Sequence, residues 1–347
     1  MIQQLVIILA IGIVVMCSLL LILTCYVVIQ RLINKRARLL INNYITKHAD
    51  DWYDYLINEI DNEDLIKPAY AQDFAAIEEI LGKYKKNVTS NRLSLRISMF
   101  ANDYMSHYYC KRLHHSRWSI RLNAIYRVLD FQIDSLTSTV IEMMDSGRKY
   151  TDQEYFHMLK IVVNFQPEKA KEIFMRPPIK LGEFEYRQLL LLLHAETKDK
   201  LLLLFDNLPE PCQYALIKVI AEKNDRNKIT FLEELIADKD KEMRIRALKA
   251  ISVLGTISDV NRYLPIMDSK HWEERLMLAK ILNYIPVEQS SQPLKRLMQD
   301  REWWVRYQAA KSLVNSARGK LILKEFIKET DDLYAKEMAN NVIQESL

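Results

Sequence analysis

The chain has 347 residues, of which 49% are hydrophobic and 27% charged, and its formal net charge is +4. This composition provides for a sizeable core and a soluble surface, and the small net charge argues against a nucleic-acid-binding domain, which is usually more basic. Only 6 Gly and 9 Pro occur, too few for the many tight turns of a sheet protein, so we expect an all-α fold. The four cysteines form no disulfide framework, which suits a reducing compartment.

The first predicted element is a membrane anchor. Residues 5–29 contain no charged side chain, and a helix of that length exceeds the roughly 30 Å of a bilayer's hydrocarbon core. The alternative, a cleaved secretion signal, fits poorly because no basic residue precedes the apolar run and the run is too long. Basic residues follow it directly: Arg31, Lys35, Arg36 and Arg38. The positive-inside rule therefore predicts a single-pass protein of the cell membrane with a cytoplasmic carboxyl-terminal part.

Residues 31–92 are predicted to form a helical connector after the anchor (residues 1–30). The first part continues the membrane helix or bends away from it, and a further helix is expected over about 69–85. The connector carries a group of carboxylates: Asp50, Asp51, Asp54, Glu59, Asp61, Glu63 and Asp64. With no histidine or nucleophile at a meaningful spacing, we interpret them as a solvated face.

Residues 93–347 read as a succession of short helices with an internal repeat. Trp272-Glu-Glu-Arg275 and Trp303-Trp-Val-Arg306 align on their arginines, with Ala, Lys and Leu coinciding after each arginine. Met243-Arg-Ile-Arg246 fits the same frame, and Trp118-Ser-Ile-Arg121 repeats the pattern upstream. An Asp precedes each of the last three arginines: Asp240, Asp268 and Asp300. Segments that recur at about this length are typical of stacked helical hairpins.

These segments resemble the HEAT repeat, in particular its short bacterial form. The resemblance implies an α-solenoid over 93–347 in which each unit is two antiparallel helices, with Asp in the turn and Arg early in the second helix. It is carried by residues 225–316 and 110–131, and the Asp/Arg pair is missing from 135–222 and from the last unit. In such a stack the Arg of one unit can pair with the Asp of the next. We therefore expect a structural ladder of Asp240, Asp268, Asp300, Arg246, Arg275 and Arg306.

Four of the five tryptophans begin predicted second helices, and aromatic and Arg side chains are enriched at binding hot spots. Candidate partner-binding residues are Trp118, Arg121, Trp272, Trp303 and Trp304. Packing between repeats is the preferred interpretation for the residue three before each Arg. Trp303 and Trp304 point about 100° apart on a helix, so one of them is the preferred contact residue.

Two further groups have competing interpretations. His107, Cys110 and His114 lie on one predicted helix face, but a fourth zinc ligand is not evident, so packing is favoured and no metal is predicted. The segment Tyr108–Arg112, with His114, His115, Arg117 and Arg121 after it, is basic and aromatic. An acidic protein or a lipid headgroup suits it better than nucleic acid, and packing suits it better still.

The sequence as a whole predicts a membrane-anchored scaffold that binds another protein, without cofactor, small-molecule substrate or catalysis. A bacterial envelope or polysaccharide-synthesis complex is a suitable setting. Two alternatives stay open. One is a lyase-like enzyme, because short HEAT units also occur in chromophore lyases. The other is a sensor of anionic membrane surfaces that uses the basic connector.

Overall fold

The computed structural model describes the backbone of residues 2–346 and the side chains of residues 11–346. Within that part of the chain every regular element is helical, with 20 α-helices and no strand. The prediction of an all-α fold that begins with one long apolar helix is confirmed. The chain divides after Phe165 into two compact units, residues 2–165 (unit 1) and 166–346 (unit 2).

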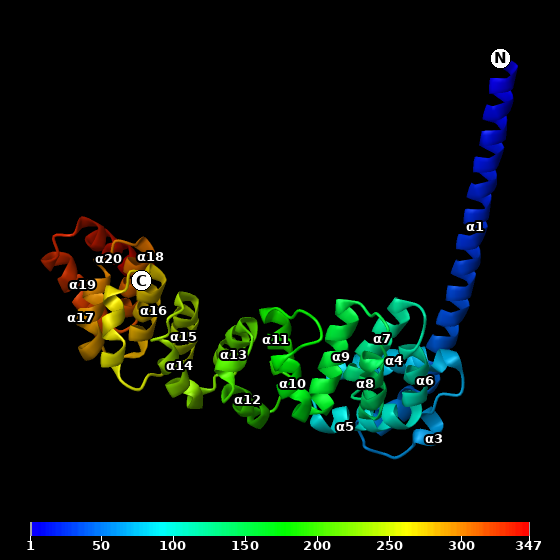
Figure 1. Ribbon diagram of the computed structural model, residues 1–347, viewed down its shortest axis with the longest axis horizontal. Coiled ribbons are helices and arrows are strands. Elements are labelled where there is room, and N and C mark those ends of the chain that lie inside the picture. The colour runs from blue at the N-terminus through cyan, green and yellow to red at the C-terminus, as the bar shows by residue number, and fades with distance from the viewer. Residues whose placement is uncertain (1, 347) are drawn as a thin grey trace. The chain divides into compact units, whose positions relative to one another are not determined.

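Unit 1 begins with α1 (Ile2–Lys47), which is 46 residues long and continues well past the expected end of the anchor (Figure 1). The part from residue 11 onward is long and apolar enough to cross a membrane, and none of its most apolar stretch is buried by the other described residues. Residues 5–10 of the expected span lie outside the described side chains. The hydroxyls of Ser18 and Thr24 donate to carbonyls one turn earlier, at 2.8 and 2.7 Å, so neither donor is left unpaired in an apolar environment.

The carboxyl-terminal part of α1 packs on α4 (Ala71–Asn87). An ion pair between Arg38 and Glu79, 2.6 Å long, joins the two helices, and the hydroxyl of Tyr44 donates to the carbonyl of Ile66. The helix that leaves the apolar segment is therefore held by the connector and is not a free tether.

The other helices of unit 1 are short and pack in sequence order. They are α2 (Ala49–Leu56), α3 (Glu63–Ile66), α5 (Asn91–Phe100), α6 (Ser106–Leu113), α7 (Trp118–Asp130), α8 (Thr137–Asp145) and α9 (Asp152–Phe165). A π-helical turn, Ala101–Met105, joins α5 to α6. Trp52 and Tyr55 of the connector form a buried aromatic cluster with Phe100 at the end of α5. Because all three are fully enclosed, the connector shares its core with α5.

Unit 2 is a stack of helical hairpins. Its helices are α10 (Ala170–Met175), α11 (Glu183–Leu190), α12 (Ala195–Leu202), α13 (Glu210–Glu222), α14 (Ile229–Leu235), α15 (Lys241–Leu254), α16 (Trp272–Ile281), α17 (Val287–Leu297), α18 (Trp303–Val314), α19 (Ala317–Glu329) and α20 (Leu333–Glu345). Five contacts in succession, α11–α13, α13–α15, α15–α16, α16–α18 and α18–α20, make one layer. The other layer contains α14, α17 and α19, and a 3₁₀ segment, Leu264–Asp268, stands where a further helix was expected.

Neighbouring helices of the first layer run parallel. Lys241 pairs with Glu273 at 2.8 Å near the starts of α15 and α16. Near the ends of α16 and α18, Ser312 donates to the carbonyl of Ala279 at 2.8 Å. These partners lie 32 and 33 residues apart in sequence. The near-constant separation places equivalent residues of successive hairpins side by side.

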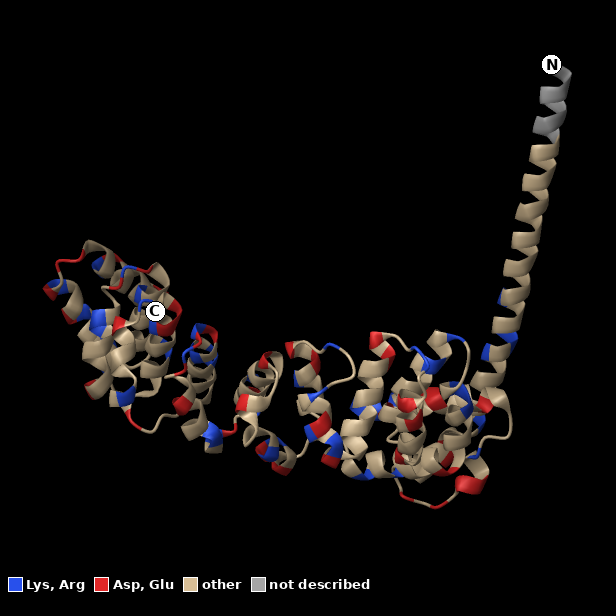
Figure 2. Cartoon of the chain, viewed as in Figure 1, with Lys and Arg blue, Asp and Glu red and all other residues tan. Residues whose placement is uncertain are grey.

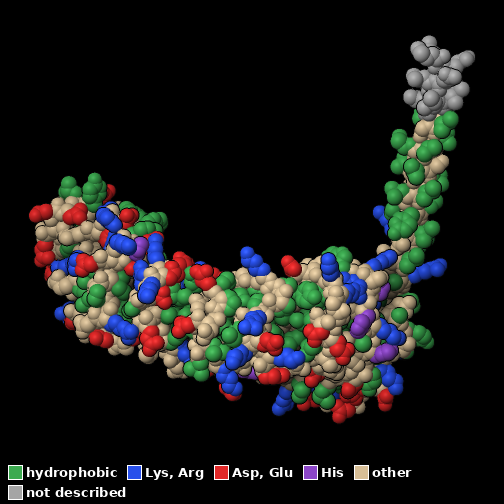
Figure 3. Space-filling view, in the orientation of Figure 1, with side chains coloured by type: hydrophobic (Ala, Val, Ile, Leu, Met, Phe, Trp, Pro, Cys, Tyr) green, Lys and Arg blue, Asp and Glu red, His purple; other side chains and the backbone are tan. Residues whose placement is uncertain are grey.

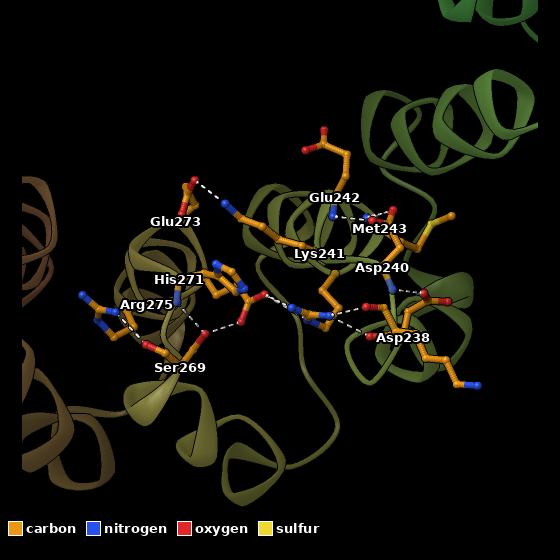
Figure 4. Close-up of polar contacts among 12 residues, drawn as sticks. Asp238, Asp240, Lys241, Glu242, Met243, Ser269, His271, Glu273 and Arg275 are labelled. Carbon is orange, nitrogen blue, oxygen red and sulfur yellow. Dashed lines mark hydrogen bonds and ion pairs between the residues drawn. The ribbon is translucent and has the colours of Figure 1, made fainter.

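A repeated arginine sets the beginning of three of these helices. The side chains of Arg244, Arg275 and Arg306, which recur at equal spacing in the sequence, each donate from Nη1 to the carbonyl six residues earlier, at 2.9, 2.6 and 2.8 Å. Those carbonyls belong to Asp238, Ser269 and Asp300. The side-chain oxygens of the same three residues accept the N–H two residues on, at 2.7, 3.1 and 2.9 Å, as Figure 4 shows for the first two. The turns before α15, α16 and α18 are thus closed by the same pair of contacts.

The arginines also link successive hairpins. Arg244 pairs with Glu274 at 2.8 Å, and Arg275 pairs with Asp300 through two bonds of 2.5 and 2.8 Å. The pair of Arg275 with Asp300 matches the expected ladder. Arg306 contacts no carboxylate within the described residues, and its Nε is buried without a partner.

The expected place of Arg246 in this ladder is wrong, because Arg244 occupies it. Arg246 pairs instead with Glu183 and Glu242, at 2.9 and 2.7 Å. Asp268 is exposed and pairs with Arg296, away from the ladder. The side chain of Asp240, by contrast, caps α15 by accepting the N–H groups of the second and third helical residues, at 3.2 and 3.0 Å, which is the role expected for an Asp in the turn.

Candidate functional site

Four large apolar side chains gather where two adjacent first-layer helices begin. Trp303 and Trp304 are the first two residues of α18, and Leu333 and Tyr334 are the first two of α20. Their exposed fractions are 48%, 58%, 75% and 71%. We call these four residues the aromatic surface. Figure 3 shows hydrophobic side chains on the outside of this carboxyl-terminal end of unit 2.

The two tryptophan rings of the aromatic surface are held in place by each other and by α18. Trp303 stacks on Tyr307, with ring centroids 5.1 Å apart and an angle of 7° between the planes, and stands edge-on to Trp304 at 4.7 Å. The guanidinium of Arg306 lies 5.6 Å from the ring centre of Tyr334, which ties α20 to α18. Rings that are fixed in this way lose little conformational entropy when a partner covers them. The arrangement is suited to binding by burial of aromatic area.

The remaining predicted binding residues do not join this surface. Trp272 begins α16 and is half-buried, so it is less available than Trp303. Trp118 is exposed at the beginning of α7, but it belongs to unit 1 and no other exposed tryptophan accompanies it there.

Arg121 is not a surface residue, which corrects its assignment as a binding candidate. It is only 5% exposed, and its Nε donates to Glu154 at 2.8 Å. Its Nη1 donates to the carbonyls of His115 and Ser116, at 3.0 and 2.7 Å, in the same manner as the repeated arginines of unit 2. Burial by itself would raise the pKa of Glu154, but bonds from Thr151 and Arg121 outweigh it and the pKa is lowered. Arg121 and Glu154 therefore form a charged, buried structural pair.

His107 and His114 are exposed and Cys110 is half-buried, so the packing side chains of this segment are the neighbouring tyrosines. Nδ1 of His114 lies 3.0 Å from the carbonyl oxygen of Cys110, and Tyr108 stacks on Phe74 with centroids 4.0 Å apart. Tyr109 is buried, and its hydroxyl donates to Glu78 at 2.8 Å. Among residues 11–346, no group of three His, Cys, Asp or Glu side chains is placed to hold a metal ion.

The carboxylates of the connector are spread over local contacts. Asp51 lies 2.9 Å from Nδ1 of His48, Asp61 pairs with Arg96 at 2.9 Å, and Asp64 pairs with Lys67 at 2.9 Å. Each of these carboxylates contacts a different side chain, so the group does not form a single acidic site.

His157 on α9 is a titratable side chain with a strongly lowered pKa. Burial, and secondarily the charge of Lys160, lowers its pKa to about 4. Its ring packs edge-on against Tyr126 at 4.3 Å and tilts against Phe156. A neutral imidazole between two aromatic rings is a packing element, and no acid or nucleophile lies beside it to make a catalytic pair.

Sequence reasoning missed Leu333 and Tyr334. The signal was present: Asp332 caps α20 by accepting the N–H groups of Tyr334 and Ala335, at 2.9 and 3.1 Å. Two large apolar residues begin α20 after the N-cap residue Asp332, as Trp303 and Trp304 begin α18 after the N-cap residue Glu302, although the side chain of Glu302 makes no capping bond. The last unit lacks the arginine, so an alignment on arginines passed over it.

Comparison with known proteins adds no family. No protein-family model and no curated protein matches the chain. Among solved structures, the chain is similar to the crystal structure of an engineered protein from the Northeast Structural Genomics Consortium, at 13% identity over 79% of this chain and 80% of that chain, with a TM-score of 0.33. A likeness of that degree supports no conclusion about fold or function.

Proposed function

We propose that this protein is a membrane-anchored scaffold that binds a partner protein through the aromatic surface. The observation that carries the proposal is the gathering of Trp303, Trp304, Leu333 and Tyr334, all about half or more exposed, on two adjacent helix starts. A soluble protein rarely leaves large apolar side chains together in water unless something covers them. Tryptophan and tyrosine are also the residue types that contribute most at protein interfaces.

The proposal places the helical units in the cytosol, next to a single membrane span. Arg31, Lys35 and Arg36 are exposed directly after the apolar segment (Figure 2), and this bias supports a cytoplasmic side. The same side chains could contact anionic lipid, at about 1 kcal/mol each. That contact would reinforce the anchor without replacing it.

The helical hairpins are proposed to be HEAT-like, on the strength of the equal spacing of Arg244, Arg275 and Arg306. Scaffolds of this kind present surface and do not need a catalytic centre. The bacterial envelope complex stays a suitable setting for the partner.

Site-specific photo-crosslinking in intact membranes tests the proposal. A photoreactive amino acid replaces Trp304 or Tyr334, and, as a control, Leu203, which is 87% exposed but isolated after α12. We expect one discrete protein adduct from positions 304 and 334, and none of that mass from position 203. Identical adducts at all three positions, or adducts with lipid alone at 304 and 334, would contradict a partner-binding role.

A further inference from the structure

Four lysines recur at equal spacing on successive first-layer helices. They are Lys218 on α13, Lys249 on α15, Lys280 on α16 and Lys311 on α18. These helices contact one another in that order, so the lysines form one line across the stack, which we call the lysine row. Packed helix axes lie about 8–10 Å apart, which makes the row roughly 30 Å long.

The charges of the lysine row are largely unneutralised. Lys249, Lys280 and Lys311 have no carboxylate within ion-pairing distance among residues 11–346, and Lys218 reaches Glu183 only at 3.9 Å. Lys241, on the same layer, pairs with Glu273 at 2.8 Å. The layer therefore pairs other basic side chains and leaves this row open.

A second row runs beside the first. The residues four positions before the lysines are Tyr214, Ile245, Leu276 and Tyr307, and all four are half-buried. Residues four apart lie on one helix face, so this apolar row borders the lysine row along its whole length. Between α13 and α15 the surface deepens to a groove of about 490 Å³, whose lining includes Ile245, Lys249 and the 58% exposed Val253.

We propose that the lysine row and the apolar row together dock an extended acidic peptide segment of the partner. The inference rests on the proposed function in one respect, namely that the protein binds a protein. It assigns a surface that adjoins the aromatic surface at Tyr307, which stacks on Trp303, and gives the chemistry of what binds there. Carboxylates of the segment pair with the lysines, and apolar side chains between them cover the apolar row.

The spacing of the row favours an extended chain. A polyproline II helix has three residues per turn and rises about 3.1 Å per residue, so its side chains repeat on one face every ~9.3 Å. That repeat matches the spacing of packed helices. An α-helical ligand has a repeat of about 5.4 Å and would bring its carboxylates into register with the lysines only irregularly.

The surroundings of the row disfavour a polyanion such as a nucleic acid or polyphosphate. The basic strip is one side chain wide, and carboxylates stand beside it at Glu222, Glu242 and Glu273. A polymer with a charge on every unit would meet these carboxylates as well as the lysines. It would also leave the apolar row uncovered, whereas a peptide can cover it.

Fluorescence anisotropy with the full chain in nanodiscs of zwitterionic lipid tests the proposal. The probe is a labelled peptide of about twelve residues that repeats Glu-Leu-Pro, which favours polyproline II and places an acid at every third position. The comparison peptide has the same composition with its acids in one block. We expect the repeating peptide to bind about fivefold more tightly or better, since only its charges match the row.

Charge reversal locates the binding. Lys249→Glu with Lys280→Glu should weaken the repeating peptide about tenfold or more. The matched control, Lys324→Glu with Lys328→Glu, changes the net charge equally at exposed lysines of α19, and should weaken it less than about twofold because those lysines lie in the other layer.

Three results would overturn the inference: no binding of the repeating peptide, equal binding of both peptides, or equal weakening by both double variants. Tighter binding of a single-stranded oligonucleotide or of polyphosphate than of the peptide would assign the row to a polyanion instead. Photo-crosslinking at positions 304 and 334 is read separately. If adducts form there but the peptide test fails, the proposed scaffold role is still supported and only the proposed binding at the lysine row is refuted.

Discussion

The buried pair of Arg275 with Asp300 is the contact whose removal should most disturb unit 2. Both side chains are almost fully enclosed, with exposed fractions of 5% and 8%, and two bonds of 2.5 and 2.8 Å join them. In Asp300→Asn the side chain keeps its shape and can still accept the N–H of Glu302, but the charge of Arg275 is left uncompensated. Removing one partner of a buried pair costs about 3–5 kcal/mol.

Hydrogen exchange measured by mass spectrometry gives the readout. We expect the amides of α16, residues 272–281, to lose protection by about 100-fold, which corresponds to the lower end of that range. The control is Glu196→Gln, which breaks an exposed pair with Lys200 and should leave exchange unchanged. The double variant Arg275→Met with Asp300→Leu should recover much of the protection, because an apolar pair of similar volume carries no uncompensated charge.

A loss of protection of less than about fivefold in Asp300→Asn, or about 1 kcal/mol, would refute the reasoning, since an exposed pair would behave in that way.

The pH dependence of stability offers an independent check. Burial alone would raise the pKa of Asp300, but bonds from Arg275 and from the N–H of Glu302 lower it below its ordinary value of 3.8. The stability that comes from a lowered folded-state pKa is present above the ordinary pKa and is lost on further acidification. The Asn variant should lack that part of the acid transition.

The remaining predictions concern other parts of the fold. Gly319→Ala should destabilise unit 2 by several kcal/mol in urea unfolding, because an added Cβ would lie 1.9 Å from the carbonyl oxygen of Leu313. Gly82→Ala is the control: nothing lies within 4 Å of the added Cβ, so this variant should stabilise α4 by about 0.5–1 kcal/mol. Glu233 is buried, but hydrogen bonds from Ser258 and Tyr263 lower its pKa. Glu233→Gln should therefore lower the free energy of unfolding above about pH 4.5 and flatten the acid unfolding curve. An acid unfolding curve with the same pH dependence as that of the unaltered protein would contradict this. Deleting residues 5–29 should release the chain from membranes in carbonate extraction, and retention of the deleted form would show a second attachment.

The all-α fold and the long apolar helix could be predicted because they follow from local composition. Few Gly and Pro occur, and the uncharged run of residues 5–29 cannot be hidden in a domain of short helices. The tryptophans that begin α7, α16 and α18 were also correctly placed at helix starts, because each follows a turn signal in the sequence.

The equal spacing of Arg244, Arg275 and Arg306 in the sequence favours Arg244 as the arginine that closes the turn before α15, but the tertiary structure alone decided which carboxylate it meets. Arg244 and Arg246 are two residues apart, which turns them about 200° from one another on a helix, so they cannot face the same neighbour. Only packing against α16 shows that Arg244 faces Glu274 while Arg246 faces Glu183. The partner of a buried charge comes from a different hairpin, and no local pattern contains it.

The same reason explains the two surfaces. Sequence spacing placed Trp303 and Trp304 on one helix, but Leu333 and Tyr334 join them only because α20 packs on α18. The regular recurrence of the lysines is visible in the sequence. That Lys249, Lys280 and Lys311 lack acidic partners depends on the tertiary structure, in which Lys241, Arg244 and Arg246 pair with the carboxylates of the layer. Local sequence determines where helices form, while burial and pairing are set by neighbours about 30 residues away, which become neighbours only when the hairpins stack.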